Sequence, residues 1–168
     1  MSRRLHTRTG FTLIEIIVVL AIVAILALVA VPSIQDRLVR NEIVEAMKLA
    51  DVAKAPLAAR WALSRTLPDD NAAAGLPVAE KIVSNLVSAV TVENGAIHVR
   101  FGNRANNAIA GQTLTLRAAV VADAQVVPVA WVCAGAAAPV NMTLQGVDRS
   151  SVAAKYLPLN CLAAAAPK

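Results

Sequence analysis

The chain has 168 residues, of which 57% are hydrophobic and 16% are charged. This composition excludes an intrinsically disordered protein, because such chains are polar and highly charged. The length fits one domain plus a targeting or anchoring segment. The formal net charge is +5, but three of the arginines lie within the first eight positions, and the remainder of the chain is close to neutral. The basic pI is therefore weak evidence for nucleic-acid binding.

Residues 11–31 form an apolar stretch with a single charged residue, and a polar, basic leader precedes it. As a helix, this stretch would span about 31 Å, close to the roughly 30 Å of a bilayer's hydrocarbon core. It is longer than the apolar core of an ordinary secretory signal, and no convincing small-residue cleavage site follows it. Basic residues tend to remain cytoplasmic. The stretch therefore predicts a transmembrane helix, with the rest of the chain beyond the membrane.

Glu15 is the charged exception within this stretch. A carboxylate at the centre of a bilayer-spanning helix costs about 2.5–3.5 kcal/mol on insertion scales. One interpretation is that Glu15, one turn into the helix, reaches the membrane interface. The other is that it pairs with a positive group inside an assembly. If the chain were cut before Phe11, the new α-amino group would be such a partner, on the same chain or on a neighbour.

The segment Gly10-Phe11-Thr12-Leu13-Ile14-Glu15, between a basic leader and a long apolar helix, resembles that of a type IV prepilin. The resemblance implies that a prepilin peptidase cuts between Gly10 and Phe11 and then methylates the Phe11 amino group. It also implies that Glu15 is the glutamate needed for subunit assembly, and that Pro32 is the proline of the family's amino-terminal helix. Major pilins, minor pilins and secretion pseudopilins share this motif.

A helical pattern continues beyond Pro32 to about residue 64. Apolar residues recur at spacings of three, four or seven, with Lys54 as the one exception: Ile43, Met47, Ala50, Leu57 and Trp61. We predict one helix over residues 11–64, about 80 Å long, apolar all round in its first half and on one face in its second. Because proline lacks an N–H and crowds the preceding turn, kinks are expected at Pro32 and Pro56.

Turn residues over 65–85 predict a loop, and residues 86–132 predict a sheet. The runs 87–92 and 96–101 flank Glu93-Asn94-Gly95, a hairpin signal, and 113–121 and 126–132 supply two further strands. Pro128 places the last strand at an edge or a bulge. The prediction is an α+β fold in which a four-stranded antiparallel sheet packs on the long helix, as in pilin heads. Alternation turns Ile97, Val99 and Phe101 toward the helix and His98, Arg100 and Arg117 toward solvent.

The two cysteines, Cys133 and Cys161, both lie in the carboxy-terminal third. An even pair beyond a membrane span, without C-x-x-C spacing or a histidine cluster, favours a disulfide in an oxidising compartment. Two unrelated buried thiols are the alternative. The resemblance implies that this pair closes the carboxy-terminal loop of a major pilin, residues 133–161.

Enzymatic chemistry has no support in the sequence. One of the two histidines, His6, lies in the leader, so His98 is the only candidate for acid–base work. No phosphate-binding glycine loop, nucleotide motif or metal-ligand cluster occurs. We therefore expect no enzyme, no cofactor and no metal site.

The predicted organisation is a removable leader (1–10), a transmembrane and polymerisation helix (11–35) and a head (36–168) that includes the amphipathic half of the helix (36–64). The resemblance implies a structural subunit of a type IV pilus, polymerising with itself and other pilins into an extracellular filament for adhesion, twitching motility or DNA uptake. Its partners would be a prepilin peptidase and N-methyltransferase and the inner-membrane assembly machinery, and its precursor would wait in the bacterial inner membrane.

Two alternatives accompany this interpretation. The first is a minor or DNA-binding pilin whose head contacts DNA through His98, Arg100 and Arg117. Against it, aromatic residues are not interleaved with these basic ones. The second is a type II secretion pseudopilin. The cysteine pair and the lack of a recognisable calcium site argue against that class.

The first prediction concerns processing. The mature protein should lack residues 1–10 and carry one added methyl group on Phe11, as measured by intact mass spectrometry of sheared surface fibres. Fibres whose subunits begin with an unmodified Met1 would contradict it.

Overall fold

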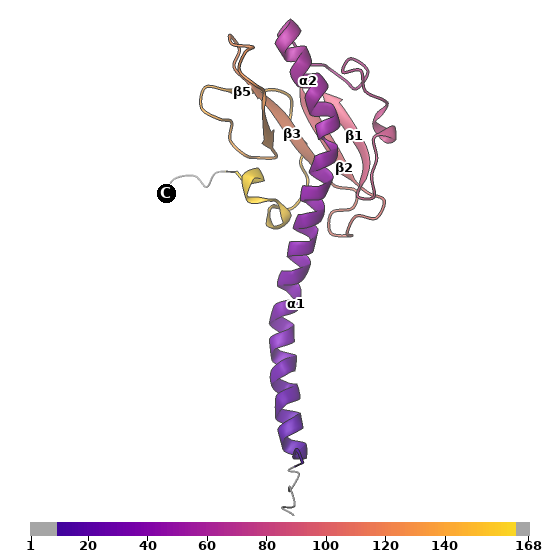
Figure 1. Ribbon diagram of the computed structural model, residues 1–168, viewed down its shortest axis with the longest axis vertical. Helices are drawn as coiled ribbons and strands as arrows, with labels where there is room; N and C mark the ends of the chain where they lie inside the picture. The colour runs from indigo at the N-terminus through magenta and orange to yellow at the C-terminus, as the bar shows by residue number, and fades with distance from the viewer. Residues whose placement is uncertain (1–9, 164–168) are drawn as a thin grey trace, which may run out of the picture. The chain divides into compact units, whose positions relative to one another are not determined.

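The computed structural model describes residues 10–163, apart from the side chains of residues 29–33. The chain divides into two compact units, Met1–Asp36 and Arg37–Lys168, and each is described by itself. Helix α1 covers Leu13–Leu49 and therefore belongs to both units, whereas α2 covers Asp51–Ser64. The strands come after α2 along the chain (Figure 1): β1 Val87–Glu93, β2 Ala96–Phe101, β3 Thr113–Val120, β4 Ala130–Cys133 and β5 Thr143–Leu144.

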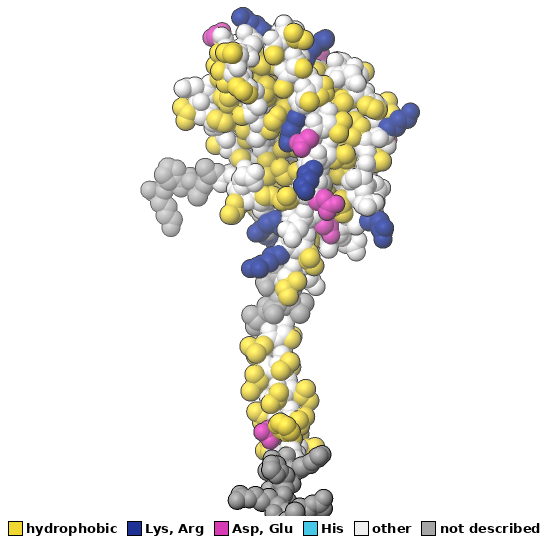
Figure 2. All heavy atoms as spheres, in the orientation of Figure 1, with side chains coloured by type: hydrophobic (Ala, Val, Ile, Leu, Met, Phe, Trp, Pro, Cys, Tyr) yellow, Lys and Arg dark blue, Asp and Glu magenta, His cyan; other side chains and the backbone are white. Residues whose placement is uncertain are grey.

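The first unit consists of the amino-terminal part of α1. The Thr12 hydroxyl accepts a hydrogen bond from the Glu15 backbone N–H at 3.3 Å, so Thr12 caps the helix before Leu13. Large apolar side chains from Leu13 to Leu28 are between 46% and 81% exposed, and Figure 2 shows hydrophobic side chains covering this part of the helix. This unit therefore buries no core of its own among its described residues.

Two predictions for this helix are not tested by the structure. Among the residues whose side chains are described, no helix is long and apolar enough to cross a membrane. The transmembrane span predicted for residues 11–31 is thus not shown by the structure. Helix α1 runs through position 32. The side chain of Pro32 lies outside the described ones, and the kink predicted there stays a prediction.

The single helix predicted to residue 64 is divided at Ala50. The Ala50 N–H bonds the Met47 carbonyl at 3.1 Å, an i→i−3 bond that tightens the chain between α1 and α2. Pro56 lies inside α2. Its ring crowds the carbonyl four residues earlier, at Val52, in the first turn of α2. The irregular hydrogen bond at Ala50 thus lies before Pro56 in the chain. A kink at Pro56 itself stays a prediction.

The second unit contains an antiparallel sheet in the order β1-β2-β3-β4, with β5 pairing with β3. Asn94 and Gly95 both have positive φ, 48° and 82°, as expected of a two-residue hairpin turn. The α+β prediction is confirmed, with two corrections. The fourth strand begins at Ala130, after Pro128, rather than at residue 126, since proline cannot supply a ladder N–H. A fifth, two-residue strand was not predicted.

The core lies between one face of the sheet and the helices from Val39 onward. Ile43 and Leu57 are fully buried there, as are Ile97, Val99 and Phe101 of β2. Each such side chain contributes about 1.5–3 kcal/mol on burial. The predicted inward face of β2 is therefore confirmed.

The predicted loop region after α2 is held to the sheet by Asn71, which is only 9% exposed. Its Nδ2 donates to the carbonyls of Pro77 (2.9 Å) and Val90 (3.0 Å), and its Oδ1 accepts from the Val92 N–H at 2.6 Å. The amide thus pairs with the edge of β1 as a neighbouring strand would, which satisfies backbone groups that an edge strand leaves unpaired.

The carboxy-terminal segment is fixed by the predicted disulfide. Cys133, at the end of β4, is bonded to Cys161, 28 residues later, and their Cα atoms are 4.6 Å apart. The Arg40 guanidinium of α1 donates to the Lys155 carbonyl at 2.6 Å, which ties the same segment to the helix.

The second prediction concerns this bond. Replacing both cysteines (Cys133→Ser with Cys161→Ser) should lower the free energy of unfolding by about 3–4 kcal/mol, because the bond restricts a loop of this length in the unfolded chain. Denaturant unfolding of the full-length protein in detergent measures the change. Reduction of the unaltered protein should reproduce the loss, and unchanged stability in either case would contradict the prediction.

Candidate functional site

The amino-terminal segment carries the residues predicted to control processing and assembly. Gly10 and Phe11 precede the first helical residue, and Phe11 is 78% exposed. A Cβ added at Gly10 would meet no atom of the described residues within 4 Å, its chain neighbours aside. The Gly10–Phe11 peptide bond therefore lies in exposed, non-helical chain, which is the form of backbone that a peptidase can bind.

Glu15 lies exposed in the first turn of α1. Within the described part of the chain its carboxylate makes no ion pair. A carboxylate at this position interacts favourably with the amino-terminal end of the helix dipole, typically by about 0.3–1 kcal/mol. Thr12 and Glu15 also have the spacing of a capping box. Glu15 can therefore stabilise the start of the helix whether or not it pairs with another subunit.

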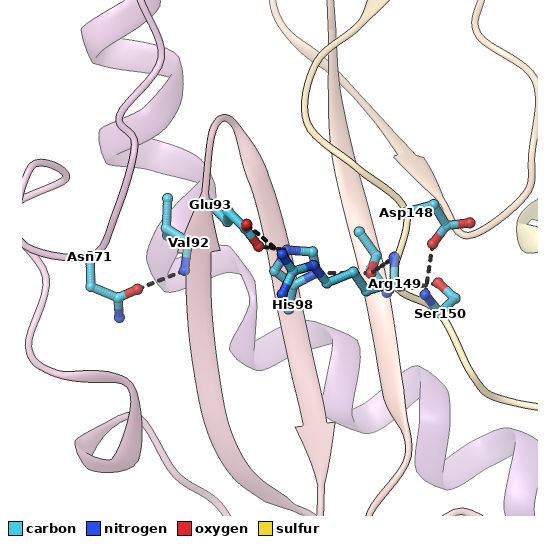
Figure 3. A network of polar contacts seen from close by, with 8 residues as sticks. Asn71, Val92, Glu93, His98, Asp148, Arg149 and Ser150 are labelled. Carbon is cyan, nitrogen blue, oxygen red and sulfur yellow. Dashed lines mark hydrogen bonds and ion pairs between the residues drawn. The ribbon is translucent and has the colours of Figure 1, made fainter.

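A second group of polar residues surrounds His98 in the head (Figure 3). His98 in β2 lies directly opposite Thr115 in β3, and His98 Nδ1 is 2.9 Å from Thr115 Oγ1. On the other side of the ring, Nε2 lies 3.3 Å from Glu93 Oε2 without the alignment of a hydrogen bond. The Arg149 guanidinium donates to Glu93 Oε1. These contacts join β1, β2, β3 and the segment after β5.

The His98 ring is contacted on both sides. Thr115 Oγ1 accepts the Arg149 backbone N–H at 3.0 Å and lies within hydrogen-bond distance of His98 Nδ1. His98 Nε2 faces the Glu93 carboxylate. Burial lowers the pKa of His98 below its ordinary 6.5, and the Arg149 charge lowers it further, while Glu93 and Asp148 act in the opposite direction. His98 is therefore neutral at pH 7.

The prediction that His98 faces solvent is wrong. Its side chain does lie on the predicted face of the sheet, away from the face that carries Ile97 and Val99. However, His98 is only 6% exposed, and its neighbour Thr115 is fully buried. The segment at Arg149 and Ser150 covers this face, since the Thr115 N–H also donates to Ser150 Oγ at 3.0 Å. The alternation of apolar and polar residues along a strand predicts which face of the sheet a side chain lies on. It does not predict whether another segment of the chain covers that face.

The three residues predicted to contact DNA do not form one exposed surface. Arg100 is exposed, whereas His98 is buried beneath the Arg149 segment. Arg117 is half-buried, and its guanidinium donates to the Ala134 carbonyl at 3.0 Å. Two of the three side chains are therefore occupied within the head.

The order Thr115, His98, Glu93 resembles a hydroxyl–imidazole–carboxylate triad. The hydroxyl oxygen is nevertheless fully buried and already accepts an N–H, so no substrate reaches it. Among the described residues, no group of three metal-ligating side chains occurs either. The cluster joins strands to the carboxy-terminal segment and is not a catalytic arrangement. Sequence reasoning missed Glu93 and Arg149 because 56 positions separate them.

The third prediction concerns pH. The unfolded chain takes up a proton on His98 near pH 6.5, and the folded chain does so only at lower pH. The free energy of unfolding should therefore fall as the pH is lowered through about 6.5 toward the folded pKa, and it should be insensitive to this group at higher pH. Without the leader, His98 is the only histidine.

Urea unfolding of the leader-free protein at pH 8 and pH 5.5 measures this effect, with His98→Gln as the matched variant. The variant should lose the part of the pH dependence due to the imidazole. An identical pH dependence in both proteins would contradict the prediction.

Comparison with known proteins assigns the chain to a family. Residues 39–162 match the family described as Pilin (bacterial filament), and residues 5–31 match the prokaryotic N-terminal methylation motif. Fimbrial protein EcpC of Eikenella corrodens is 33% identical over 161 residues, covering 94% of this chain and 93% of the relative. A type IV major pilin protein PilE1 of Neisseria gonorrhoeae is 33% identical over 163 residues, covering 93% and 88%.

A fimbrial protein of Neisseria meningitidis serogroup B is 32% identical over 108 residues, which is 64% of each chain. The matched family is a family of structural filament subunits, and this confirms the prediction that the chain is not an enzyme. The family match covers most of the chain and includes both the sheet and the disulfide. On this evidence, together with the α+β head and the methylation motif, the chain belongs to the pilin family of bacterial filaments.

Proposed function

We propose that this chain is the major structural subunit of a type IV pilus and that it polymerises through the first part of α1. The observation that carries the proposal is the exposed apolar surface of that helix, on which side chains such as Leu13 (81%) and Leu28 (77%) lie open. Apolar surface of this extent is unfavourable in water and marks an interaction site. Packing against the same helix of neighbouring subunits would bury it.

Processing is the first step of the proposed pathway. The match to the methylation motif supports cleavage between Gly10 and Phe11 followed by methylation of the new amino group by a prepilin peptidase. Cleavage removes Arg3, Arg4 and Arg8, which would otherwise hold the amino terminus on the cytoplasmic side. The helix could then leave the membrane for a filament.

Before assembly, the precursor would wait in the inner membrane, where the pilus assembly machinery and other pilins would receive it. The basic leader and the apolar sequence of residues 11–31 support this location. The head would lie outside the cytoplasm, where its disulfide is stable. The assembled filament would serve in surface adhesion, in twitching motility or in DNA uptake.

Glu15 would control the assembly step. In a bundle of apolar helices its carboxylate needs a cation, and cleavage creates one, the Phe11 amine of a neighbouring subunit. Removing one partner of a buried ion pair typically costs about 3–5 kcal/mol, because the other charge is left uncompensated. The pairing would thereby fix the axial position at which each subunit joins the filament.

The fourth prediction separates this role from the helix-capping role. Glu15→Gln keeps the size of the side chain but removes its charge, so the protein should be made, found in membranes and processed, yet give few or no surface filaments. Thr12→Ala is the control, because it removes the cap of the same helix without changing the charge, and it should leave filaments abundant. Electron microscopy of cells with each variant as the only pilin, beside immunoblots of their membranes, measures both.

Normal filaments from Glu15→Gln would show that the carboxylate only stabilises the helix start or reaches the membrane interface, and the assembly role would be withdrawn. Loss of filaments in both variants would assign the effect to the helix cap. Full-length protein that is missing from the membrane fraction would contradict the proposed precursor location.

A further inference from the structure

Residues 145–152, which we call the covering segment, follow β5 and lie on the face of the sheet away from the helices (Figure 3). Hydrogen bonds to β3 hold this segment in place. The Arg149 N–H donates to Thr115 Oγ1 at 3.0 Å. The Ser151 N–H donates to the Thr113 carbonyl at 2.9 Å, and Ser151 Oγ accepts the Thr113 N–H at 3.0 Å. The contact between the segment and the sheet is therefore largely polar.

The covering segment buries little apolar surface of its own. Val152, at its end, is buried, whereas Val147 is 67% exposed. Segments with few buried apolar contacts open locally at free energies below that of global unfolding. Both ends of the segment stay attached when it opens, because β5 pairs with β3 before it and the Cys133–Cys161 bond lies after it. The segment can therefore leave the sheet and return without unfolding of the head.

The imidazole of His98 lies beneath the covering segment. Its Nε2 atom is buried, makes no hydrogen bond among the described residues, and is 3.3 Å from Glu93 Oε2. The other carboxylate oxygen, Glu93 Oε1, accepts from the Arg149 guanidinium. One carboxylate thus faces both the arginine that holds the segment and a ring that can gain a charge. A proton on the ring would make it compete with Arg149 for Glu93, and it would also need water, which the closed segment excludes.

The charged groups that face this imidazole are mostly positive. Arg100 of β2 and Arg117 of β3 lie on its face of the sheet, and Arg149 covers it. The acids are Glu93 of β1 and Asp148 of the covering segment. Burial, followed by the Arg149 charge, lowers the pKa of the ring below its ordinary 6.5, and the two acids offset this only in part. A proton there adds to an excess of positive charge where water is scarce.

We propose that the covering segment is an acid-released latch: proton uptake by His98 opens residues 145–152 from the sheet while the strands stay paired. In the closed form His98 is neutral and Arg149 holds Glu93. In the open form the imidazole is charged and hydrated beside Glu93, and the Arg149 side chain is released to solvent. The latch does not depend on the proposed function, because all its residues lie within the head.

The direction of the pH effect follows from the difference between the two forms. In the open form His98 has an ordinary pKa of about 6.5, whereas in the closed form it takes up its proton only at lower pH. Lowering the pH through 6.5 therefore favours opening. Between pH 7.5 and pH 5.5 the equilibrium constant for opening should rise by at most about tenfold, because protonation of the open form sets that limit.

Amide hydrogen exchange, followed by NMR on the full chain in detergent micelles with its disulfide intact, tests the latch. After correction for the intrinsic exchange rate at each pH, the amides of Arg149 and Ser151 should exchange several-fold faster at pH 5.5 than at pH 7.5. Low concentrations of urea should change these rates little, because local opening exposes little surface. The Phe101 amide, which donates to the Gln112 carbonyl at 2.8 Å, should exchange more slowly and respond more strongly to urea.

Three variants identify the groups responsible. His98→Gln cannot titrate, so its covering segment should be equally protected at both pH values. Arg149→Gln removes a side chain that is 59% exposed, so the head should stay folded, and the segment should exchange faster than in the unaltered protein already at pH 7.5. The His98 ring of this variant should also titrate at higher pH, because a neighbouring positive charge is gone. Arg104→Gln, the same change at an exposed position outside this cluster, should behave as the unaltered protein does.

Equal protection of the Arg149 and Ser151 amides at the two pH values would overturn the proposal. Exchange of these amides with the same rate and urea dependence as Phe101 would also overturn it, because the segment would then open only by global unfolding. An acid effect that persists in His98→Gln would assign it to another group and reject the latch. An unchanged titration of His98 in Arg149→Gln would show that the two side chains are not coupled, with the same consequence.

Discussion

The packing of one apolar helix face on the sheet is the interaction on which the head depends. The buried helix positions are large at both ends and small in the middle: Ile43 and Leu57 fill the space above the sheet, and Ala46, Ala50 and Ala53 between them are almost completely buried. Small side chains let the helix backbone lie close to the strands, and a chain with five aromatic residues in 168 can fill its core in this way. The same helix also positions the Arg40 guanidinium at the carboxy-terminal segment.

Two further sets of contacts are built on this helix–sheet packing. On one edge of the sheet, Asn71 acts as a substitute strand for β1. On the second face, Glu93, His98 and Arg149 hold the segment after β5, and the Cys133–Cys161 bond holds the chain near residue 161. Loops are thus fastened at several points to a rigid sheet.

The first part of α1 has the opposite character. Its apolar side chains from Leu13 to Leu28 remain exposed within its own unit, and Glu15, the one charged residue of positions 11–31, makes no ion pair among the described residues. A segment of this kind has little to stabilise within one subunit and much to gain from copies of itself. If the proposed function holds, contacts between copies of this segment would need only apolar packing and one carboxylate.

Several features of this protein could be predicted from its sequence because their causes are local. Hydrophobic periodicity indicated the helical region, though not its division at Ala50, and strand alternation gave the inward face of β2. The Asn94-Gly95 pair indicated the hairpin, and the segment from Gly10 to Glu15 indicated the family. The disulfide was also foreseeable, since only two cysteines exist. In each case the signal lies within a few residues, where backbone sterics and side-chain alternation act directly.

Other features were decided only by tertiary structure. The sequence by itself placed His98 on the correct face of its strand but assigned it to solvent, since nothing near position 98 indicates that Arg149 and Ser150 cover that face. It treated Asn71 as part of a turn, although the amide pairs with β1, 19 and 21 residues away. Such contacts depend on how separate helices, strands and loops pack against one another. The alternation and spacing of residues along the chain do not specify that packing.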